Sequence, residues 1–384
     1  MKTDRKNMKL HSIIYSLLLL TLTSCVTQFT LDDNLPLEDK VDKYFTYLTE
    51  EKNFHGVVLI SKGENVLINK GYGSASDEKQ FPMKSETILD IGSITKPFTA
   101  TTIMKLVEQN MLDTEQKIID FFQNIPADKQ AITVHQLLTH TSGLPADFAD
   151  DLDTLTKEQA LQKILSSKLV AQPGEKYEYS NTGYAALALI IEKVTNQSYH
   201  SYVRDSIFSK LDMNSSGFYG DNYLSKNLYY TGYMNNTKTD YTTINASYLY
   251  GNTLGNGGIL STTGDMLKWV HAVTDNFFSP AIKERMFTSS NDGYGYGWVV
   301  SSTGNGKKFW HDGGGLGGNS YVAMYPEKQI TIIILSNRIT YQTVFGIPVK
   351  VLLPADEAGR QILKNMMSND FTKMPKKSIP GGRW

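Results

Sequence analysis

Hydrophobic positions repeat with a helical period where the folded part of the chain begins. Val41, Tyr44, Phe45 and Leu48 recur at intervals of three and four residues, which predicts an amphipathic helix. Two β-rich runs follow at residues 56–61 and 66–71, and the Lys-Gly-Glu-Asn sequence between them is typical of a hairpin. The N-terminal part of the fold should therefore be a helix followed by two antiparallel strands.

The same strand pattern returns near the other end of the chain, at residues 320–325 and 330–336, with a Pro-Glu-Lys-Gln turn between them. The region between the two hairpins has mostly helical patterns. Strands at both ends with helices between them do not follow the alternating rhythm of a parallel sheet. The order predicts an α+β fold, in which helices flank an antiparallel sheet and a helical lobe is inserted at about residues 112–215. The expected helices are at residues 99–109, 160–167, 184–194 and 201–211.

Two segments toward the C-terminus have a different character. Residues 219–250 contain eight tyrosines among Asn, Thr and Gly, which predicts long surface loops. These tyrosines are either solvated or form a rim that stacks on sugar or peptide. At the end of the chain, residues 354–384 should form a helix and then a loose tail.

Composition excludes several classes of protein. With 384 residues, 40% hydrophobic residues and 30 glycines, the chain is globular and long enough for two lobes. A net charge of −1 provides no overall positive field for nucleic acid, so no nucleic-acid partner is expected. The single cysteine excludes intramolecular disulfides and thiolate metal clusters.

The N-terminus predicts export from the cytoplasm. Basic residues precede an apolar run at residues 13–22, which is long enough for a signal peptide and too short to span a bilayer. We expect residues 1–24 to be removed. The sequence Leu22-Thr23-Ser24-Cys25 resembles the bacterial lipobox, which implies a lipid on Cys25, a tether over residues 25–38 and membrane anchoring. In a Gram-negative cell, Val26 would favour the periplasmic face of the outer membrane. The alternative is an ordinary signal peptide with an incidental thiol.

The first candidate for chemistry is Ser93-Ile94-Thr95-Lys96, which precedes a helical run. Ser93 and Lys96 are three residues apart and share one helix face, so the lysine can activate the serine hydroxyl as a nucleophile. The helix N-terminus adds positive potential near a developing oxyanion. The alternative is an N-cap serine followed by a surface lysine.

Two later clusters favour the catalytic interpretation. They are Tyr179-Ser180-Asn181, just before a predicted helix, and His311-Asp312-Gly313-Gly314-Gly315, just before the last hairpin. In this order the three clusters resemble the motifs S-x-x-K, Y-x-N and H-x-G of the serine β-lactamase and penicillin-binding protein superfamily, in its class C form. The segments at residues 135–145, 257–262 and 335–337 also resemble that family. We therefore expect a β-lactamase-like catalytic domain at residues 39–353, with the fold of DD-peptidases and β-lactamases.

The resemblance implies a role for each matching residue. Ser93 would be the acylated nucleophile, and Lys96 would handle its proton. Tyr179 would be the general base and later the acid, which requires nearby cations, Lys96 first, because a phenol titrates at about pH 10. Asn181 would orient the acyl-side amide of the substrate or the lysine. The backbone N–H groups of Ser93 and Gly314 would form the oxyanion hole.

The third motif departs from the lactamase pattern. His311 stands where lactamases place a lysine, so its charge should change between about pH 5.5 and 7.5, and activity with it. Together with Gly313, it is expected to contact the substrate. Asp312 would repel a substrate carboxylate, which favours esters, amides or substrates with a free amine. Alternatively, Asp312 points away and pairs elsewhere.

No metal or cofactor is expected. His135 and His140 lack the H-E-x-x-H pattern and a third partner, so structural roles are predicted for both. The chain has no G-x-S-x-G sequence, which excludes the nucleophile elbow of α/β-hydrolases.

The sequence as a whole predicts an exported serine hydrolase that acts through a Ser93 acyl-enzyme on cell-wall-type D-amino-acid peptides or esters. A β-lactamase and a D-Ala-D-Ala carboxypeptidase are alternatives within the enzyme class. A penicillin or peptidoglycan sensor that is acylated once, without turnover, is the alternative from another class. The acyl specificity, the deacylation base and the oligomeric state are not readable from the sequence.

Overall fold

The computed structural model describes the larger part of the chain. The described residues are 29, 31–32, 34–151, 153–225, 230–234, 237–239, 251–289, 292–304, 306–315, 317–339, 341–344, 347–350 and 355–375. The predicted signal peptide, Cys25 and the last residues of the predicted tail lie outside them.

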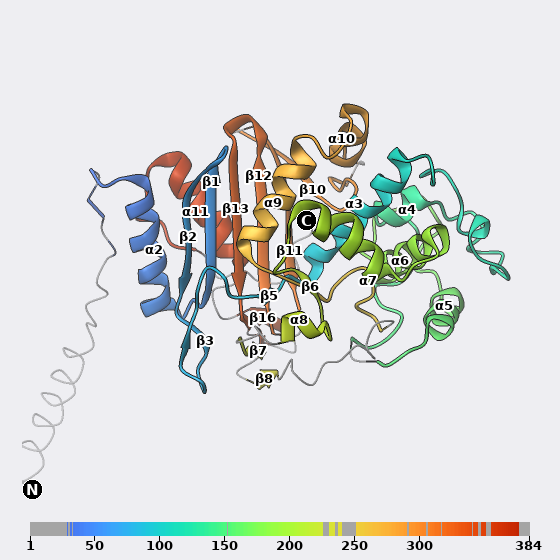
Figure 1. Cartoon of the computed structure of the whole chain (residues 1–384), viewed down its shortest axis with the longest axis horizontal. Coiled ribbons are helices and arrows are strands. Elements are labelled where there is room, and N and C mark those ends of the chain that lie inside the picture. The colour runs from blue at the N-terminus through green and yellow to red at the C-terminus, as the bar shows by residue number, and fades with distance from the viewer. Residues whose placement is uncertain are drawn as a thin grey trace, which may run out of the picture.

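A six-stranded antiparallel sheet forms the centre of the molecule (Figure 1). Its strand order is β10-β11-β12-β13-β1-β2, so strands from the two ends of the sequence meet inside one sheet. Both predicted hairpins are confirmed, and with them the α+β fold. The strands are β1 (Gly56–Lys62), β2 (Asn65–Tyr72), β10 (Val299–Thr303), β11 (Gly306–Gly314), β12 (Asn319–Tyr325) and β13 (Ile330–Ser336).

Helices cover both faces of the sheet, which is why β1 is buried continuously from Gly56 to Ser61 rather than at alternate positions. Val57 and Leu59 pack into a core with the helical lobe, whereas Val58 and Ile60 pack into a second core on the other face. Successive side chains of a strand point to opposite faces, so a single strand contributes to both cores.

Two helices from opposite ends of the chain cover the second face, α2 (Leu37–Lys52) and α11 (Ala355–Ser368) (Figure 1). The stripe predicted for the first helix is confirmed, because all four of its apolar residues are buried. The helix predicted after residue 354 is present as α11.

The remaining helices lie mainly in the lobe on the first face. Residues 184–191 of α6 are all buried, as expected for a helix with apolar side chains all round. The helices are α3 (Thr95–Glu108), α4 (Val134–Leu138), α5 (Lys157–Ser166), α6 (Asn181–Thr195), α7 (Tyr199–Val203), α8 (Asn222–Ser225), α9 (Thr263–Thr274) and α10 (Pro280–Phe287).

The helix predicted at residues 201–211 differs in detail. α7 is followed by a π-helical turn at Arg204–Phe208 and a 3-10 turn at Ser209–Leu211, and the run ends at Asp212 with φ of 53°. A change in hydrogen-bond register preserves an apolar face, so hydrophobic periodicity does not reveal it. Other 3-10 turns are at Gly92–Ile94, Ile118–Asp120 and Pro326–Lys328.

Small sheets complete the fold. One of them, with order β5-β9-β6, leads the chain directly to the segment that carries Ser93. Its strands are β5 (Leu89–Asp90), β6 (Gly217–Phe218) and β9 (Ile259–Ser261). The others contain β3 (Ser74–Ser76), β4 (Phe81–Pro82), β7 (Gly232–Met234), β8 (Thr237–Thr239), β14 (Arg338–Ile339), β15 (Tyr341–Val344) and β16 (Ile347–Lys350).

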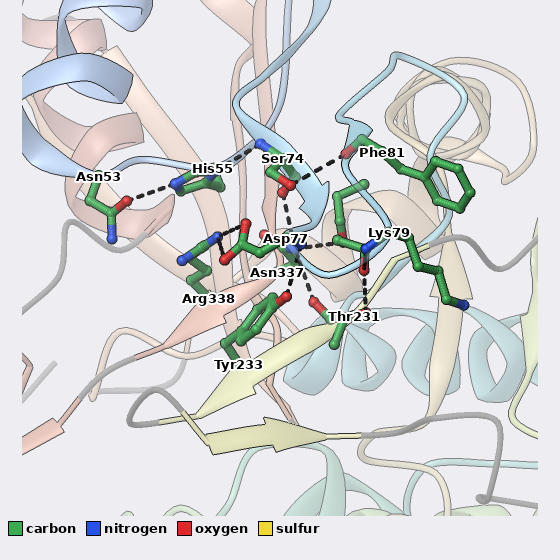
Figure 2. A network of polar contacts seen from close by, with 12 residues as sticks. Asn53, His55, Ser74, Asp77, Lys79, Phe81, Thr231, Tyr233, Asn337 and Arg338 are labelled. Atoms are coloured by element: carbon green, nitrogen blue, oxygen red, sulfur yellow. Dashed lines mark hydrogen bonds and ion pairs between the residues drawn. The ribbon is translucent and has the colours of Figure 1, made fainter.

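Asn337, the last residue of a family-like segment, has a structural role. Its fully buried amide nitrogen donates to the backbone oxygens of Ser74 at 3.3 Å, Ala75 at 3.0 Å and Thr231 at 3.0 Å. Figure 2 shows this amide between the strand that follows β2 and the segment at residues 230–234. Asn337 thus joins three parts of the chain that are distant in sequence.

The neighbouring Arg338 extends this network (Figure 2). Its guanidinium donates to both carboxylate oxygens of Asp77 at 2.6 Å and lies 4.7 Å from the ring centroid of Tyr233. The Tyr233 hydroxyl also accepts a hydrogen bond from the backbone of Asp77 at 3.0 Å. These contacts hold residues 231–233 of the tyrosine-rich segment against Asp77 and the residues that follow β13.

The expectation of solvated tyrosines in this segment is therefore wrong for Tyr219 and Tyr230, whereas Tyr223 is 43% exposed. Tyr230 is only 6% exposed, and the half-buried Tyr219 donates from its hydroxyl to the carboxylate of Asp90 at 2.9 Å. A tyrosine can bury its ring while its hydroxyl keeps a polar partner, so a polar sequence context does not require exposure. The tyrosines at 229, 241, 248 and 250 lie outside the described residues.

None of the helices in the described ranges is both long and apolar enough to cross a membrane.

Candidate active site

The backbone before Ser93 makes a sharp turn that Gly92 permits. Gly92 has φ of +51°, and its N–H donates to the buried Asp90 carboxylate at 2.7 Å. A Cβ at this position would lie 2.7 Å from the backbone oxygen of Gly314, so a side chain would separate the two segments. Ser93 then occupies a 3-10 turn directly before α3.

Within residues 88–104, all of which the structure describes, Ser93 is the only residue that is not buried. Lys96 is fully buried one turn further on, and its Nζ lies 3.0 Å from the Ser93 Oγ. The same Nζ donates to the backbone oxygen of Asn256 at 3.2 Å. The alternative of an N-cap serine with a surface lysine is therefore wrong.

Burial changes the protonation of Lys96. Removal from water disfavours the charged amine and lowers the pKa of Lys96 to about 7, although the negative charges of Asp147, Asp151 and Asp312 oppose this shift. Near neutral pH, a substantial fraction of this amine is uncharged and has a lone pair available for a proton.

Tyr179 is brought to Ser93 by the turn that starts α6. The following residue, Ser180, is the N-cap of this helix and accepts a hydrogen bond from the Gly183 N–H at 3.0 Å. The Tyr179 ring centroid is 4.7 Å from the Lys96 Nζ. Burial raises the pKa of Tyr179 well above its ordinary value, and a hydrogen bond with Ser93 offsets this only in part.

These two pKa shifts bear on the expectation that a charged Lys96 stabilises the phenolate of Tyr179. A phenolate stabilised by charged Lys96 is not favoured, because Lys96 loses its proton at a lower pH than Tyr179 does. Near neutral pH the site favours a neutral phenol beside an amine that is partly deprotonated.

His140 packs against the segment that carries Tyr179. It is fully buried with φ of 59°, and its Nδ1 accepts a hydrogen bond from the Ser180 N–H at 3.0 Å. Its ring centroid lies 4.4 Å from that of Tyr179. Burial lowers the pKa of His140 well below its usual range, so the ring is neutral. A structural role was predicted for His140, and the structure shows which segment it holds in position, the one that carries Tyr179.

His311 lies on β11 and is also buried, at 2% exposure. Its Nδ1 donates to the backbone oxygen of Asp312 at 2.6 Å, which leaves Nε2 to accept from the Tyr294 hydroxyl at 3.0 Å. Burial, assisted by the charge of Lys96, lowers the pKa of His311 to about 3. The expected titration of His311 between pH 5.5 and 7.5 is therefore wrong, because the charged imidazole is excluded from this environment.

Asp312 follows on the same strand and so points to the opposite face. Its carboxylate lies 3.6 Å from the guanidinium of Arg360 on α11. Of the two interpretations of Asp312, the structure favours the one in which it points away and pairs elsewhere. Its placement does not support direct repulsion of a substrate carboxylate.

The glycines of the third motif allow β11 to approach the Ser93 turn. A Cβ on Gly313 would lie 2.2 Å from the backbone oxygen of Ile91, which also accepts a hydrogen bond from the Ser320 hydroxyl at 2.7 Å. Gly314 packs directly against Gly92. The two N–H groups predicted for the oxyanion hole, those of Ser93 and Gly314, thus belong to adjoining backbone segments.

Asn181 contacts an acidic residue that the sequence did not single out. Its amide nitrogen donates to the Asp147 carboxylate at 2.7 Å, and Asn252 donates to the same oxygen at 2.8 Å. Asp147 follows the family-like segment at residues 135–145 by two positions, in the acid-rich sequence Asp-Phe-Ala-Asp-Asp. This run of acidic residues after the family-like segment was the feature of the sequence that could have identified Asp147 as a candidate.

The two other histidines considered as metal ligands have separate partners. The His135 Nδ1 lies 2.8 Å from the Tyr296 hydroxyl, whereas the His140 Nδ1 faces a backbone N–H. Across the described residues, no group of three or more His, Cys, Asp or Glu side chains is arranged to hold a metal ion.

Comparison with known proteins agrees with this arrangement. Residues 41–344 match the family model described as Beta-lactamase. Penicillin-binding protein 4* of Bacillus subtilis (strain 168) is 32% identical over 320 residues, which cover 77% of this chain and 70% of that protein.

Solved structures have the same fold. The octameric penicillin-binding protein homologue from Pyrococcus abyssi is similar with a TM-score of 0.72 and 28% identity, over 89% of this chain and 79% of that one. The D-amino acid amidase from Ochrobactrum anthropi SV3 shares the fold at a TM-score of 0.72 and 20% identity, over 87% of this chain and 99% of that one. The chain belongs to the beta-lactamase family and is a serine hydrolase of the superfamily that includes the penicillin-binding proteins.

Proposed function

We propose that this protein hydrolyses esters or peptides of D-amino acids, of the kind found in bacterial cell walls, through an acyl-enzyme on Ser93. The names of similar proteins support the substrate class, since they include penicillin-binding proteins and a D-amino acid amidase. The observation that carries the proposal is the 3.0 Å contact between the accessible Ser93 hydroxyl and an amine whose pKa is lowered to about 7.

In the acylation step, the neutral Lys96 amine accepts the proton of the Ser93 hydroxyl while Oγ bonds to the substrate carbonyl carbon. The oxyanion that forms is stabilised by the N–H groups of Ser93 and Gly314. The bond to the leaving group then breaks, and Tyr179 donates its phenolic proton to the departing oxygen or nitrogen. The Lys96 ammonium returns a proton to Tyr179. We therefore assign the base in this step to Lys96 and the acid to Tyr179.

In the second half of the reaction, water attacks the carbonyl carbon of the acyl-enzyme. The hydroxyl of this water stays on the carboxylic acid product, which is released, and its other proton returns to the Ser93 oxygen. A protein without this step would be a sensor that stays acylated. Asp312 pairs with Arg360 and does not argue against a carboxylate-bearing substrate. The test therefore includes a D-Ala-D-Ala peptide and a cephalosporin.

The test is a parallel assay of the purified protein on a short-chain nitrophenyl ester, a D-Ala-D-Ala peptide and a chromogenic cephalosporin. Intact mass spectrometry follows any lasting adduct. We expect turnover of the ester or peptide and no turnover by Ser93→Ala. Ser302→Ala, which removes an exposed hydroxyl on β10, is the matched control.

A serine-reactive phosphonate separates the remaining outcomes. Wild type and Ser302→Ala should both be labelled, whereas Ser93→Ala should not. Equal labelling of Ser93→Ala would overturn the proposal. Labelling with a permanent substrate adduct and no turnover would instead identify the sensor.

We also propose that the protein is attached to the cell envelope through a lipid on Cys25, on the basis of the Leu-Thr-Ser-Cys sequence after the apolar leader. Detergent partition of the full chain produced in bacteria tests this idea. Wild type should enter the detergent phase and Cys25→Ala should not, and equal partition of both proteins would contradict the anchor.

A further inference from the structure

Four polar residues that hydrogen-bond one another around Asn181, two positions after Tyr179, form a group that we call the acidic cluster: Asp147, Asp151, Asn181 and Asn252. One oxygen of Asp147 accepts hydrogen bonds from the amide nitrogens of Asn181 at 2.7 Å and Asn252 at 2.8 Å. Asp151 accepts from the same Asn252 nitrogen at 2.8 Å. The cluster brings together a loop of the helical lobe, the start of α6 and the segment before β9.

The two amide oxygens of the cluster have no hydrogen-bond partner among the residues that the structure describes. The side-chain oxygens of Asn181 and Asn252 are both buried, and no group in the described part of the chain donates to either. Asn252 is only 3% exposed as a whole. Within an amide group the oxygen lies about 2.3 Å from the nitrogen, so each of these oxygens is close to the nitrogen that contacts the carboxylate. Buried acceptors of this kind normally have a donor.

The acidic cluster is connected to the nucleophile. Asn256 donates from its amide nitrogen to the backbone oxygen of Asn181 at 3.4 Å, and its own backbone oxygen accepts from Lys96 at 3.2 Å. Lys96 in turn contacts Ser93 at 3.0 Å. The negative charges of Asp147 and Asp151 also act on Lys96, where they oppose the effect of burial on its pKa.

The chemistry of the cluster indicates its ligand. Two carboxylates and two amide oxygens offer only acceptors with a net negative charge, and an ammonium group offers three donors with a positive charge. We propose that the acidic cluster binds a free ammonium group on the acyl side of the scissile bond. The inference rests on the proposed function and narrows its substrates to aminoacyl esters and amides with an unblocked amino group.

The geometry of an amino acid agrees with this assignment. Its amino nitrogen lies about 2.5 Å from its carbonyl carbon. The cluster contains Asn181, two residues after Tyr179, whose ring centroid lies 4.7 Å from the Lys96 Nζ. An ammonium bound by the cluster would therefore direct the carbonyl toward the Ser93 and Lys96 pair. An N-acylated peptide has no positive charge at that position, and its amide must compete with water for the carboxylates. Selectivity for the free amine is therefore the expected property.

The experiment measures kcat/KM for the benzyl ester of D-alanine and for its N-acetyl derivative, by release of benzyl alcohol. Wild type should prefer the free amine by about tenfold or more, and Asp147→Asn/Asp151→Asn should reduce that preference by about tenfold. Because the ratio is taken within one protein preparation, a difference in the fraction of active enzyme cancels. A change in Lys96 basicity also cancels, since both esters use the same base.

Asp150→Asn is the matched control, because it removes the same charge from the same loop at a residue that does not bond Asn181 or Asn252. It should keep the wild-type ratio. Equal kcat/KM for the two esters in wild type, or an unchanged ratio in the double variant, would overturn the inference while Ser93-dependent turnover remained. Turnover of both esters by Ser93→Ala would instead overturn the proposed function.

Discussion

The Nζ of Lys96 lies 4.7 Å from the ring centroid of Tyr179, and Lys96 is fully buried whereas Tyr179 is half-buried. Burial shifts their pKa values in opposite directions, downward for the amine and upward for the phenol. The pair can therefore be neutral together near pH 7, which avoids an isolated charge on the buried amine. This relationship leads to the first predictions.

Acylation of Ser93 should follow the titration of Lys96. The rate of labelling by a phosphonate without titratable groups should rise about tenfold per pH unit below pH 7 and level off above it, because only the neutral amine accepts the proton. Labelling rates at fixed ionic strength from pH 5.5 to 8.5 give the profile. A flat profile would exclude Lys96 as the base.

Asp147→Asn should move the midpoint of that profile to lower pH. The Asp147 carboxylate stabilises the protonated amine, so its neutralisation makes Lys96 a weaker base. The same phosphonate assay compares the variant with Asp150→Asn, whose midpoint should stay closer to that of wild type. A midpoint that moves upward in Asp147→Asn would contradict this account.

Tyr179→Phe should lower kcat by about 10²–10⁴-fold, because the variant cannot donate a proton to the leaving group. The phenylalanine ring keeps the packing against His140, so the melting temperature should change little. Steady-state kinetics and thermal unfolding measure the two effects. Retention of more than a tenth of the wild-type kcat would remove Tyr179 from the proton path.

His311→Asn should leave the midpoint of the pH profile near 7. His311 has a pKa lowered to about 3, so it is uncharged across the range in which Lys96 titrates. We expect a lower rate, because the Tyr294 hydroxyl loses the nitrogen to which it donates. If the inflection near pH 7 disappeared in this variant, the titrating group would be His311 after all.

Asn337→Ala should destabilise the fold by about 1–3 kcal/mol, because three backbone oxygens lose their shared donor in a buried position. Denaturant unfolding measures the free energy. Asn65→Ala, at an exposed position on β2, should change stability by less than about 0.5 kcal/mol. Equal stability of the two variants would show that the amide network contributes nothing.

Much of the fold was predictable because local patterns specify it. The stripe of α2 and the two hairpins follow from periodicity, and the antiparallel sheet that joins both chain ends follows from the positions of those hairpins. The burial of Tyr219 and Tyr230 was not predictable, because it depends on contacts with residues more than a hundred positions away in the case of Asp90. The polar composition of a segment does not reveal which residues from other parts of the chain will pack against it.

The sequence by itself determined the fold class, the family, and the residues Ser93, Lys96, Tyr179 and His311 as candidates, since motif order and residue type require no coordinates. Only the tertiary structure decided their protonation, the direction of Asp312 and the presence of Asp147 and Asp151 beside Asn181 and Asn252. The physical reason is that burial and electrostatic neighbours set a pKa, and both arise from segments that meet only when the chain is folded.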